Sequence, residues 1–387
     1  MRKTIRFTIF LTIILILLSL IIPPRGTVDP GEIEPLLPAS QITDDTVKIL
    51  FIGDVMAHQR QLETALISGG DASNPNDYDF SSYFKYIKPL FDSADFVVAN
   101  MEYPTGVTPF SGYPIFSAPS SLDIEARNSG IDLFLKANNH LVDKGKAGMD
   151  STRIILQREG IAYTGFYAGE EEEYRCNPYI DTIGGICVAI INFTYGLNGF
   201  QVPEPYIVNM MDTTQIRGLV ERAIERGAEF IIATPHWGEE YQLNESATQR
   251  RWRDSLYRYG VNAIVGTHPH VVQHCEYDTL HATAYSLGNF ISNMSIAYGQ
   301  IGMVYELRLK RRPDSTIALL PPKIDYWWCA RTNKLERNYT VVPIMEYLDK
   351  KEEFREGQYE KMVREWNAIV KHFGIDTTGK RIKYIYD

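Results

Sequence analysis

The 387-residue chain is organised around one stretch, Val261-Asn262-Ala263-Ile264-Val265-Gly266-Thr267-His268-Pro269-His270. Its apolar first half predicts a short strand, and its second half places two histidines just after that strand. Open α/β sheets place their ligand sites at the carboxyl ends of their strands. Histidine is the commonest metal-binding side chain, and the intervening proline restricts the backbone so that both rings can point at one small volume. We therefore predict a metal site, with a polar loop carrying two unrelated histidines as the alternative.

The composition is that of a globular protein, with 44% hydrophobic and 22% charged residues. A chain of this length can form one large domain or two smaller ones, each with a hydrophobic core. A nucleic-acid-binding protein usually presents a basic face, whereas the formal net charge here is -9. We therefore expect no nucleic-acid partner.

The N-terminus carries a targeting segment that is separate from the fold. Three basic residues come first, Arg2, Lys3 and Arg6. An apolar run over residues 7–22 follows, with a length between that of a signal-peptide core and a full membrane span, and no small-residue cleavage site comes after it. We expect residues 1–26 to be a membrane anchor or signal. The uncleaved anchor is preferred, with the basic end in the cytoplasm and the domain extracytoplasmic, in the cell envelope. Residues 27–46, rich in Pro, Asp and Glu, read as a linker.

Export would place the cysteines in a compartment that permits disulfides. The chain has four, Cys176, Cys187, Cys275 and Cys329. They allow three complete pairings, among which the sequence does not choose, and they show no Cys-x-x-Cys spacing. We therefore favour a structural or unpaired role for them over metal binding.

Strand and helix patterns alternate along the chain from Val47 onward. Apolar runs predict strands at residues 47–53, 95–99, 131–137, 161–164, 186–193, 230–234 and 261–265. Amphipathic or charged segments predict helices at residues 148–159, 212–229 and 245–259. The alternation predicts an α/β core.

The pattern changes toward the C-terminus. Three segments predict a β-hairpin and a further strand, at residues 303–310, 315–320 and 323–330. Residues 351–373 predict a charged amphipathic helix. Its predicted packing stripe comprises Phe354, Met362, Trp366 and Val370. We expect the main domain to span residues 47–340 and a C-terminal helical extension to span residues 341–387.

Polar side chains close several of the predicted strands. They are Asp54, Glu102, Asn139, His140, His236, His268 and His270. One such residue alone is usually a turn or cap residue. Together they form a set of carboxylate, amide and imidazole groups on one edge of a sheet, which suits a pair of divalent metal ions such as Mn, Zn or Fe. Such a pair lowers the pKa of a bound water and clamps a phosphoryl oxygen, while a histidine that is not a ligand can protonate the leaving group.

Six motifs follow one another between Val47 and Phe290. They are Gly53-Asp54-Val55-Met56, Asn100-Met101-Glu102, Ala137-Asn138-Asn139-His140 with Asp143 and Gly145, His236-Trp237-Gly238-Glu239-Glu240-Tyr241, Gly266-Thr267-His268-Pro269-His270 and Tyr285-Ser286-Leu287-Gly288-Asn289-Phe290. In this order they resemble the motifs of the CapA family, poly-γ-glutamate capsule-synthesis proteins with a calcineurin-like metallophosphoesterase fold. The resemblance implies an α/β fold in which a two-sheet sandwich is flanked by helices (αββα). The C-terminal β and helical extension would follow it.

The resemblance also implies a role for each site residue. One metal ion would be held by Asp54 and His270. The second would be held by Asn139, His236 and His268. Glu102 would lie near the bridging position, and His140 would be the catalytic acid or would stabilise the transition state.

Two positions depart from the pattern of the wider superfamily. Met56 stands two residues after Asp54, where an Asp-x-His motif has its histidine, and His58 is the candidate to fill that place. Glu102 replaces the bridging aspartate. The possible additional site residues are His58, Asn100 and Glu240.

Two functional classes follow from these observations. The first is a CapA-like capsule or poly-γ-glutamate biosynthesis protein with a dinuclear-metal hydrolase site, acting on a phosphoester or on a bond in an anionic polymer. The second is a non-catalytic assembly or export factor of a membrane polymer-synthesis complex, which keeps the fold with a degraded site. A serine hydrolase is not expected, because the Gly-x-Ser-x-Gly motif is absent.

Overall fold

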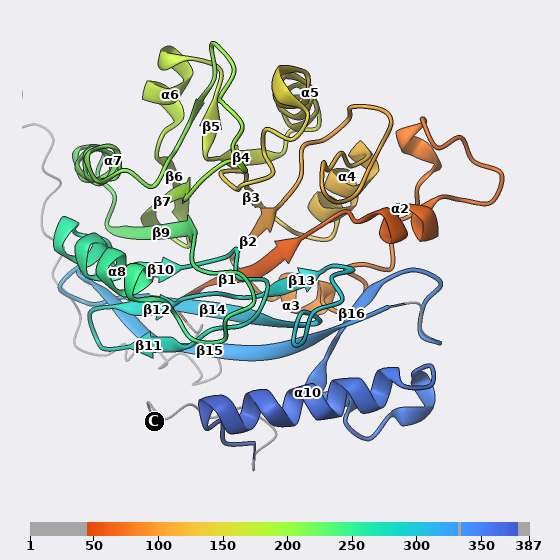
Figure 1. Cartoon of the computed structure of the whole chain (residues 1–387). Coiled ribbons are helices and arrows are strands. Elements are labelled where there is room, and N and C mark those ends of the chain that lie inside the picture. Colours follow the sequence, from red (N-terminus) through yellow and green to blue (C-terminus); the bar gives the residue numbers. More distant parts are fainter. Residues whose placement is uncertain (1–44, 332–333, 378–387) are drawn as a thin grey trace, which may run out of the picture. The chain divides into compact units, whose positions relative to one another are not determined.

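The computed structural model describes residues 45–331 and 334–377 (Figure 1). The predicted anchor or signal and most of the predicted linker lie outside the described residues. Within the described part, no helix is both long and apolar enough to cross a membrane. The domain boundary at residue 340 stays a prediction.

The first sheet is centred on β1 (Thr46–Val55), the strand that carries Asp54. Its other strands are β2 (Phe96–Met101), β3 (Leu133–Leu135), β4 (Ala162–Thr164), β13 (Asn289–Ile291), β14 (Ile301–Arg311), β15 (Ile317–Ala330) and β16 (Thr340–Pro343). They lie in the order β16-β15-β14-β1-β2-β3-β4, and β13 pairs with the end of β1. The strands β1 to β4 are parallel, whereas β14, β15 and β16 extend the sheet in antiparallel fashion.

The second sheet contains β6 (Tyr179–Ile183), β7 (Ile186–Thr194), β9 (Phe230–His236), β10 (Ala263–Val265), β11 (Cys275–Tyr277) and β12 (Ala282–Ala284). Their order is β11-β12-β10-β9-β7-β6, and β7, β9, β10 and β12 run parallel. A separate antiparallel pair consists of β5 (Phe166–Tyr167) and β8 (Ile207–Val208). The histidines His268 and His270 therefore follow directly after a central strand of the second sheet.

Helices connect many of these strands. They are α2 (Gln59–Ala65), α3 (Lys88–Phe91), α4 (Ser120–Asn128), α5 (Gly145–Arg158), α6 (Glu170–Cys176), α7 (Thr213–Glu225), α8 (Ala247–Tyr259), α9 (Ile344–Tyr347) and α10 (Gln358–Phe373). Asp212 caps the N-terminus of α7, because its carboxylate accepts a hydrogen bond from the backbone N–H of Gln215 at 2.8 Å.

The two sheets pack face to face through alternate residues of their strands. Ile49 and Phe51 of β1 share one buried cluster with Val188 and Ile190 of β7. This spacing of two follows from the pleat of a β-strand, which turns successive side chains to opposite faces. The inner faces of both sheets thus form the core of a sandwich.

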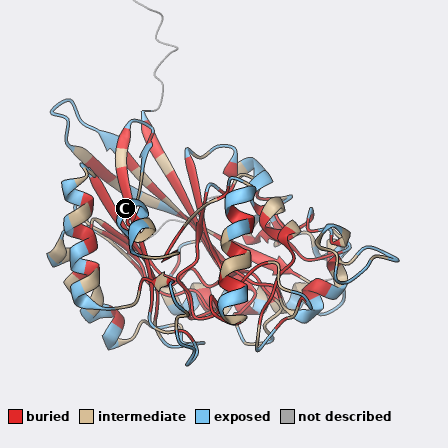
Figure 2. Cartoon of the chain, turned by 90° about the horizontal axis from the view of Figure 1, so that it is seen from above, coloured by how far each residue is buried: buried red, intermediate tan, exposed pale blue. Residues whose placement is uncertain are grey.

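Helices cover the outer faces of both sheets. Leu50 and Ile52 of β1 pack in a second buried cluster with Leu122 of α4. Ala189 of β7 packs in a third cluster with Leu219 of α7. Figure 2 shows the buried strands enclosed by helices whose outward sides are exposed. The predicted order of layers, helix, sheet, sheet and helix, is confirmed.

The predicted helix over residues 351–373 is wrong at its start. Residues 351–353 form a separate 3₁₀ turn, and α10 begins only at Gln358. Gly357 precedes α10 with a φ of 78°, a left-handed conformation that interrupts a continuous helix. The segment is therefore a turn followed by a helix.

The C-terminal helix packs along β15 (Figure 1). Three of the predicted packing residues are buried, Phe354, Met362 and Trp366. Ile369 is also fully buried, whereas the predicted Val370 is only half-buried. The Trp366 ring lies 5.0 Å from the ring of Tyr326 on β15. This helix therefore contributes to the hydrophobic core.

The four cysteines form no disulfide. Cys275 and Cys329 are buried, and burial raises the pKa of both thiols. These two residues pack as small apolar side chains.

Candidate metal centre

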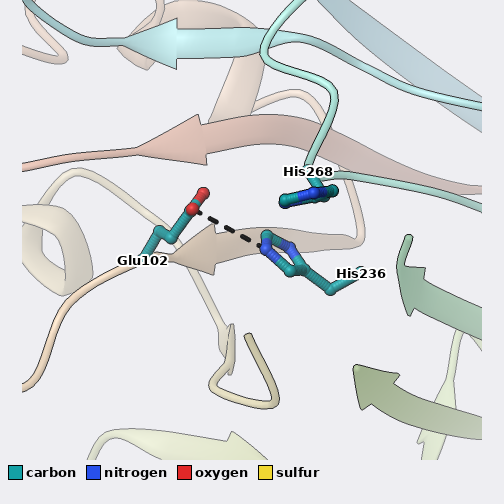
Figure 3. Close-up of side chains that lie close together, drawn as sticks. All are labelled: Glu102, His236 and His268. Carbon is teal, nitrogen blue, oxygen red and sulfur yellow. Dashed lines mark ion pairs between the residues drawn. The ribbon is translucent and has the colours of Figure 1, made fainter. Parts of the chain in front are cut away.

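The parallel strands of both sheets end at one place, and the predicted site residues gather there. Asp54 belongs to β1, Glu102 follows β2, Asn139 follows β3, His236 ends β9, and His268 and His270 follow β10. Glu102, His236 and His268 come from different strands and face one another (Figure 3). The sandwich thus brings together residues that are far apart in the sequence.

Glu102 is shared by two overlapping groups of candidate ligands. One group contains Glu102, His236 and His268, and the other contains Asp54, Glu102 and His270. Within each group the ligand atoms lie within 4.8 Å of one another. Glu102 Oε1 is 3.7 Å from His236 Nε2 and 3.8 Å from His270 Nε2. The carboxylate therefore lies between two candidate metal positions.

A third group places Glu240 with His268 and His270. Glu240 is exposed, whereas both histidines are buried. It lies in a tight turn in which Gly238 and Tyr241 have φ values of 96° and 66°. Glu240 is thus at the mouth of the site.

Unpartnered polar atoms test whether these residues fit metal ions. Asp54 Oδ2, Glu102 Oε1 and His268 Nδ1 are buried and have no hydrogen-bond partner in the described part of the chain. A buried polar atom without a partner is costly, and a bound ion or water is one explanation for it. A divalent ion would satisfy them, and a mixture of carboxylate, amide and imidazole ligands suits Mn, Zn or Fe. The residues present therefore fit divalent metal ions.

Burial adjusts the charge of these ligands in the metal-free protein. It raises the pKa of Glu102 well above the usual range, and the neighbouring carboxylates of Asp54 and Glu240 raise it further. Burial and the neighbouring histidines lower the pKa of His236 and of His268 well below the usual value. Both imidazoles are therefore neutral at pH 7, as metal coordination requires.

Hydrogen bonds orient the candidate ligands. His236 Nδ1 lies 3.0 Å from Thr267 Oγ1, and His270 Nδ1 lies 3.0 Å from Asn289 Oδ1. These contacts leave the Nε2 atoms of both rings facing Glu102. Thr267 and Asn289 were not predicted as site residues, although both lie within the quoted motifs.

Asn100 lies beneath the site. Its side-chain amide donates to Asp54 Oδ1 at 2.7 Å and to Glu102 Oε2 at 3.4 Å. An amide nitrogen is a donor and cannot be a metal ligand in this orientation. Asn100 therefore holds two candidate ligands together.

Asn139 joins the group that contains His236. Its Oδ1 atom lies 2.8 Å from His236 Nε2, and its amide nitrogen donates to Asn198 Oδ1 at 3.2 Å. The oxygen of the amide therefore faces the candidate metal position.

His140 is the neighbour of Asn139 but has different contacts. Its Nδ1 atom lies 2.7 Å from Asp143 Oδ2, and its ring meets Phe116 edge-on at 4.6 Å. Asp143 also accepts the backbone N–H of Phe116 at 2.7 Å, which fixes the carboxylate. Among the described residues, His140 is in none of the three ligand groups. Asp143 was part of the motif that contains His140, but it was not predicted as a site residue.

His58 also lies outside the ligand groups of the described chain. Its Nδ1 atom lies 3.1 Å from Gln61 Oε1 and 3.3 Å from the backbone nitrogen of Asn293, and its ring meets Phe116 edge-on at 5.2 Å. Met56 stands two residues after Asp54, where an Asp-x-His motif has its histidine, and it is fully buried in an apolar cluster. The structure therefore does not bring His58 into the place left by Met56.

Acid should destabilise the protein partly through His58. Burial lowers the pKa of His58 from 6.5 to about 4, so its contribution to stability is present above pH 6.5 and is lost as the pH falls through about 4. This shift corresponds to about 3 kcal/mol. Denaturant unfolding of metal-free protein should show a smaller loss of stability between pH 6.5 and 4 in a His58→Gln variant. Equal losses in His58→Gln and in the exposed control His274→Gln would contradict the assignment.

Two glycines permit the strands to meet closely at the site. A Cβ atom on Gly53 would lie 1.9 Å from the carbonyl oxygen of Gly288, and one on Gly266 would lie 2.2 Å from the carbonyl oxygen of Tyr285. No side chain fits at either position. These glycines therefore fix the approach of the strands that carry Asp54 and His268.

Both histidines of the His-x-His motif have left-handed backbone conformations. The φ values are 97° for His268 and 59° for His270. Such conformations cost about 1–3 kcal/mol per residue and occur mainly at functional sites. Both residues with these conformations belong to the candidate ligand groups.

Glycine in place of His268 should relieve this strain. We expect the metal-free His268→Gly variant to be more stable than His268→Ala by about 1 kcal/mol, because alanine keeps the strained backbone and glycine does not. Both variants should bind metal more weakly than the wild type. Denaturant unfolding measures the difference, and equal stability of the two variants would show that the backbone at His268 is not strained.

Exposed aromatic rings surround the histidines. The ring of Tyr195 lies 4.4 Å from that of His268, and the ring of Tyr241 stacks on that of His270 at 6.2 Å. Both tyrosines are 44% exposed. Tyr241 ends one of the quoted motifs, whereas Tyr195 lies in none of them.

The fold and the site have the features that the six motifs implied. A helix–sheet–sheet–helix sandwich carries carboxylate, amide and histidine groups at the carboxyl ends of its parallel strands. Residues 48–294 match the family of bacterial capsule synthesis proteins, PGA_cap, and this match covers more than half of the chain. The chain belongs to that family, as the six motifs predicted.

Two curated relatives carry names from capsule biosynthesis. The capsule biosynthesis protein CapA of Bacillus anthracis is 22% identical over 304 residues, which cover 75% of this chain and 71% of the relative. The PGA biosynthesis protein CapA of Bacillus subtilis (strain 168) is 23% identical over 288 residues, which cover 72% of each chain.

Solved structures with a similar arrangement are more distant. The NAD nucleotidase of Haemophilus influenzae has a TM-score of 0.44 at 12% identity, over 85% of this chain and 60% of the nucleotidase. A calcineurin-like phosphoesterase from Bacillus subtilis has a TM-score of 0.43 at 14% identity, over 84% of this chain and 98% of the phosphoesterase. This chain thus spans less than two thirds of the nucleotidase's length.

Proposed function

We propose that the protein is a metal-dependent hydrolase that takes part in capsule or poly-γ-glutamate biosynthesis. The observation that carries the proposal is the pair of overlapping ligand groups that share Glu102, in which buried atoms of Asp54, Glu102 and His268 have no hydrogen-bond partner. One divalent ion would be held by Asp54, Glu102 and His270. The other would be held by Glu102, Asn139, His236 and His268.

The bound ions would supply an activated water and positive charge for a phosphoryl oxygen. The chain itself supplies a proton donor. Asp143 holds His140 through Nδ1, so that Nε2 is the atom left to deliver a proton to the leaving oxygen. Tyr195 and Tyr241 line the entrance and would hold the part of the substrate that does not react.

The family and the names of the two relatives support a substrate from capsule synthesis. We propose a phosphoester, or a bond in the anionic polymer, handled together with a membrane synthesis complex. The basic residues before the apolar run at residues 7–22 support an anchored, extracytoplasmic position. Protease added to spheroplasts should then degrade the domain while it stays with the membrane fraction, and protection of the domain would contradict this orientation.

One observation favours a second candidate function, that of a non-catalytic assembly or export factor. Met56 is buried in an apolar cluster where the wider superfamily has a histidine ligand, and it offers no nitrogen or oxygen to a metal ion. A site with fewer ligands would bind one ion weakly. The fold would then serve only to bind partners.

A substrate screen separates the two candidates. Purified full-length protein, loaded with Mn, Zn or Fe, should hydrolyse at least one member of a panel of phosphomonoesters, phosphodiesters and γ-glutamyl polymers. A chelator should stop the reaction, and the same metal should restore it. Full metal occupancy without turnover on any member of the panel would favour the assembly factor.

A further inference from the structure

Lys136 is a fully buried lysine next to the site, and the roles proposed above do not use it. It follows β3 and precedes the loop that carries Asn139 and His140. Among the described residues, no carboxylate forms an ion pair with its ammonium group within 4.0 Å. A buried ammonium is costly unless its surroundings compensate the charge. The partners that do so indicate what the residue does.

The ammonium group of Lys136 holds the backbone on both sides of Glu102. Its Nζ donates to the carbonyl oxygen of Met101 at 2.9 Å and to that of Tyr103 at 2.5 Å. It also lies 4.8 Å from the centre of the Tyr103 ring, a cation–π distance. Two carbonyl dipoles that flank one residue thus point at one positive charge.

The backbone at Glu102 forms a tight turn that this charge stabilises. The N–H of Tyr103 donates to the carbonyl oxygen of Met101 at 3.0 Å, so the turn closes around Glu102 alone. Asn138 donates to the same oxygen at 3.0 Å. Without the ammonium, the Met101 and Tyr103 carbonyl oxygens would face each other with no cation between them. The turn directs the Glu102 side chain out of the strand and into the site.

The Asp123 carboxylate accepts hydrogen bonds from the residues that follow Glu102. Tyr103 donates through its hydroxyl to Asp123 Oδ1 at 2.9 Å, and Thr105 donates to Asp123 Oδ2 at 2.7 Å. Asp123 is fully buried in α4 and acts on Lys136 through its charge. This network connects the helix layer to the turn at Glu102.

We propose that Lys136 is a positioning residue for the shared carboxylate of Glu102. It locks the turn that places Glu102 Oε1 between the two candidate metal positions, and it links that turn to the loop bearing Asn139 and His140. This inference rests on the metal site proposed above. Lys136 itself does not touch a metal ion or substrate.

The test uses Lys136→Met, which keeps the length of the side chain and removes its charge and N–H groups. Binding of Zn²⁺ or Mn²⁺ alone is measured by calorimetry on the purified full chain. Loss of an outer partner of a ligand typically weakens metal binding about 10–100-fold, and we expect a loss in this range. The control is Lys361→Met, because Lys361 also lies over an aromatic ring, that of Trp328 at 5.3 Å, but in the C-terminal helix. It should bind metal as the wild type does.

A double-mutant cycle separates positioning from general destabilisation. If Lys136 acts through Glu102, Lys136→Met should have little further effect on metal binding in a Glu102→Gln background, whereas independent effects would add. Tighter binding by Lys136→Met would mean that the lysine only repels the ions, and it would overturn the proposal. So would additive effects in the cycle.

Two further outcomes are decisive. If Lys136→Met and Lys136→Leu both fail to fold, the lysine is a determinant of stability and the positioning role is wrong. If the wild type binds no metal, the proposed function and this inference fail together. Normal binding by both the wild type and Lys136→Met contradicts the inference alone.

Discussion

Replacing His140 with alanine should leave both metal positions filled and should lower turnover by about 10²–10⁴-fold, the range usual for a positioned general acid. The reason is that a ligand sets the charge of the site, whereas an acid acts only on the leaving group as it departs. Asp143 fixes the His140 ring at 2.7 Å, and His140 lies outside the ligand groups of the described residues. Steady-state kinetics and metal analysis on the same preparation measure the two effects separately.

The neighbouring residue and a distant histidine provide the comparison. Asn139→Ala should lower metal occupancy, because its Oδ1 atom faces the position shared with His236. His281→Ala removes a histidine that also pairs with an aspartate, Asp278 at 3.6 Å, but lies away from the site, and it should change neither quantity. If His140→Ala strips the metal, His140 is a ligand. If turnover is unchanged, the reaction is not acid-assisted cleavage.

Glu102→Gln should have the largest effect on metal binding. Glu102 is the ligand common to two groups, so its loss affects both positions, whereas His236→Ala and His270→Ala should each weaken one. Outer partners alone cost about 10–100-fold in affinity, so loss of a shared ligand should cost more than about 100-fold. Calorimetric titration with Zn²⁺ or Mn²⁺ measures this affinity.

The same substitution should stabilise the metal-free protein. The pKa of Glu102 is raised in the folded state, so its contribution to stability is present below the usual carboxyl pKa and is lost as the pH rises through the folded pKa. Glutamine stays neutral at every pH. Above the usual carboxyl pKa, metal-free Glu102→Gln should therefore have a higher melting temperature than the wild type. Asp325→Asn, which changes a half-buried acid on β15, is the control for metal binding and should leave it unchanged. A melting temperature of Glu102→Gln below that of the wild type would contradict the account of Glu102.

The sequence predicted much of the fold because each buried strand is a short apolar run that can be recognised without its neighbours. The runs at residues 186–193 and 230–234 correspond to β7 and β9, and Trp327 and Trp328 face opposite clusters as a strand requires. The start of α10 was wrong because the charged residues before Gly357 fit a helical pattern equally well. A pattern of polarity does not show where the backbone turns left-handed.

The sequence predicted which residues belong to the candidate site, but the structure was needed to show which of them lie close enough to share a metal ion. Strand ends gave Asp54, Glu102 and His236, because chemistry and position coincide there. The contacts of Lys136 on either side of Glu102 were not predicted. In the sequence Lys136 is a single charged residue at the end of an apolar run, and its hydrogen-bond partners are backbone carbonyl groups. Contacts of that kind leave no signature in the sequence.

The most direct test of the metal centre is the metal content of the purified full-length protein. Inductively coupled plasma mass spectrometry after dialysis should find two equivalents of divalent metal in the wild type and fewer than one in Glu102→Gln. The comparison matters because both candidate positions depend on this one carboxylate. A wild type without metal after incubation with Mn, Zn or Fe, or a Glu102→Gln variant that keeps two equivalents, would contradict the shared dinuclear site.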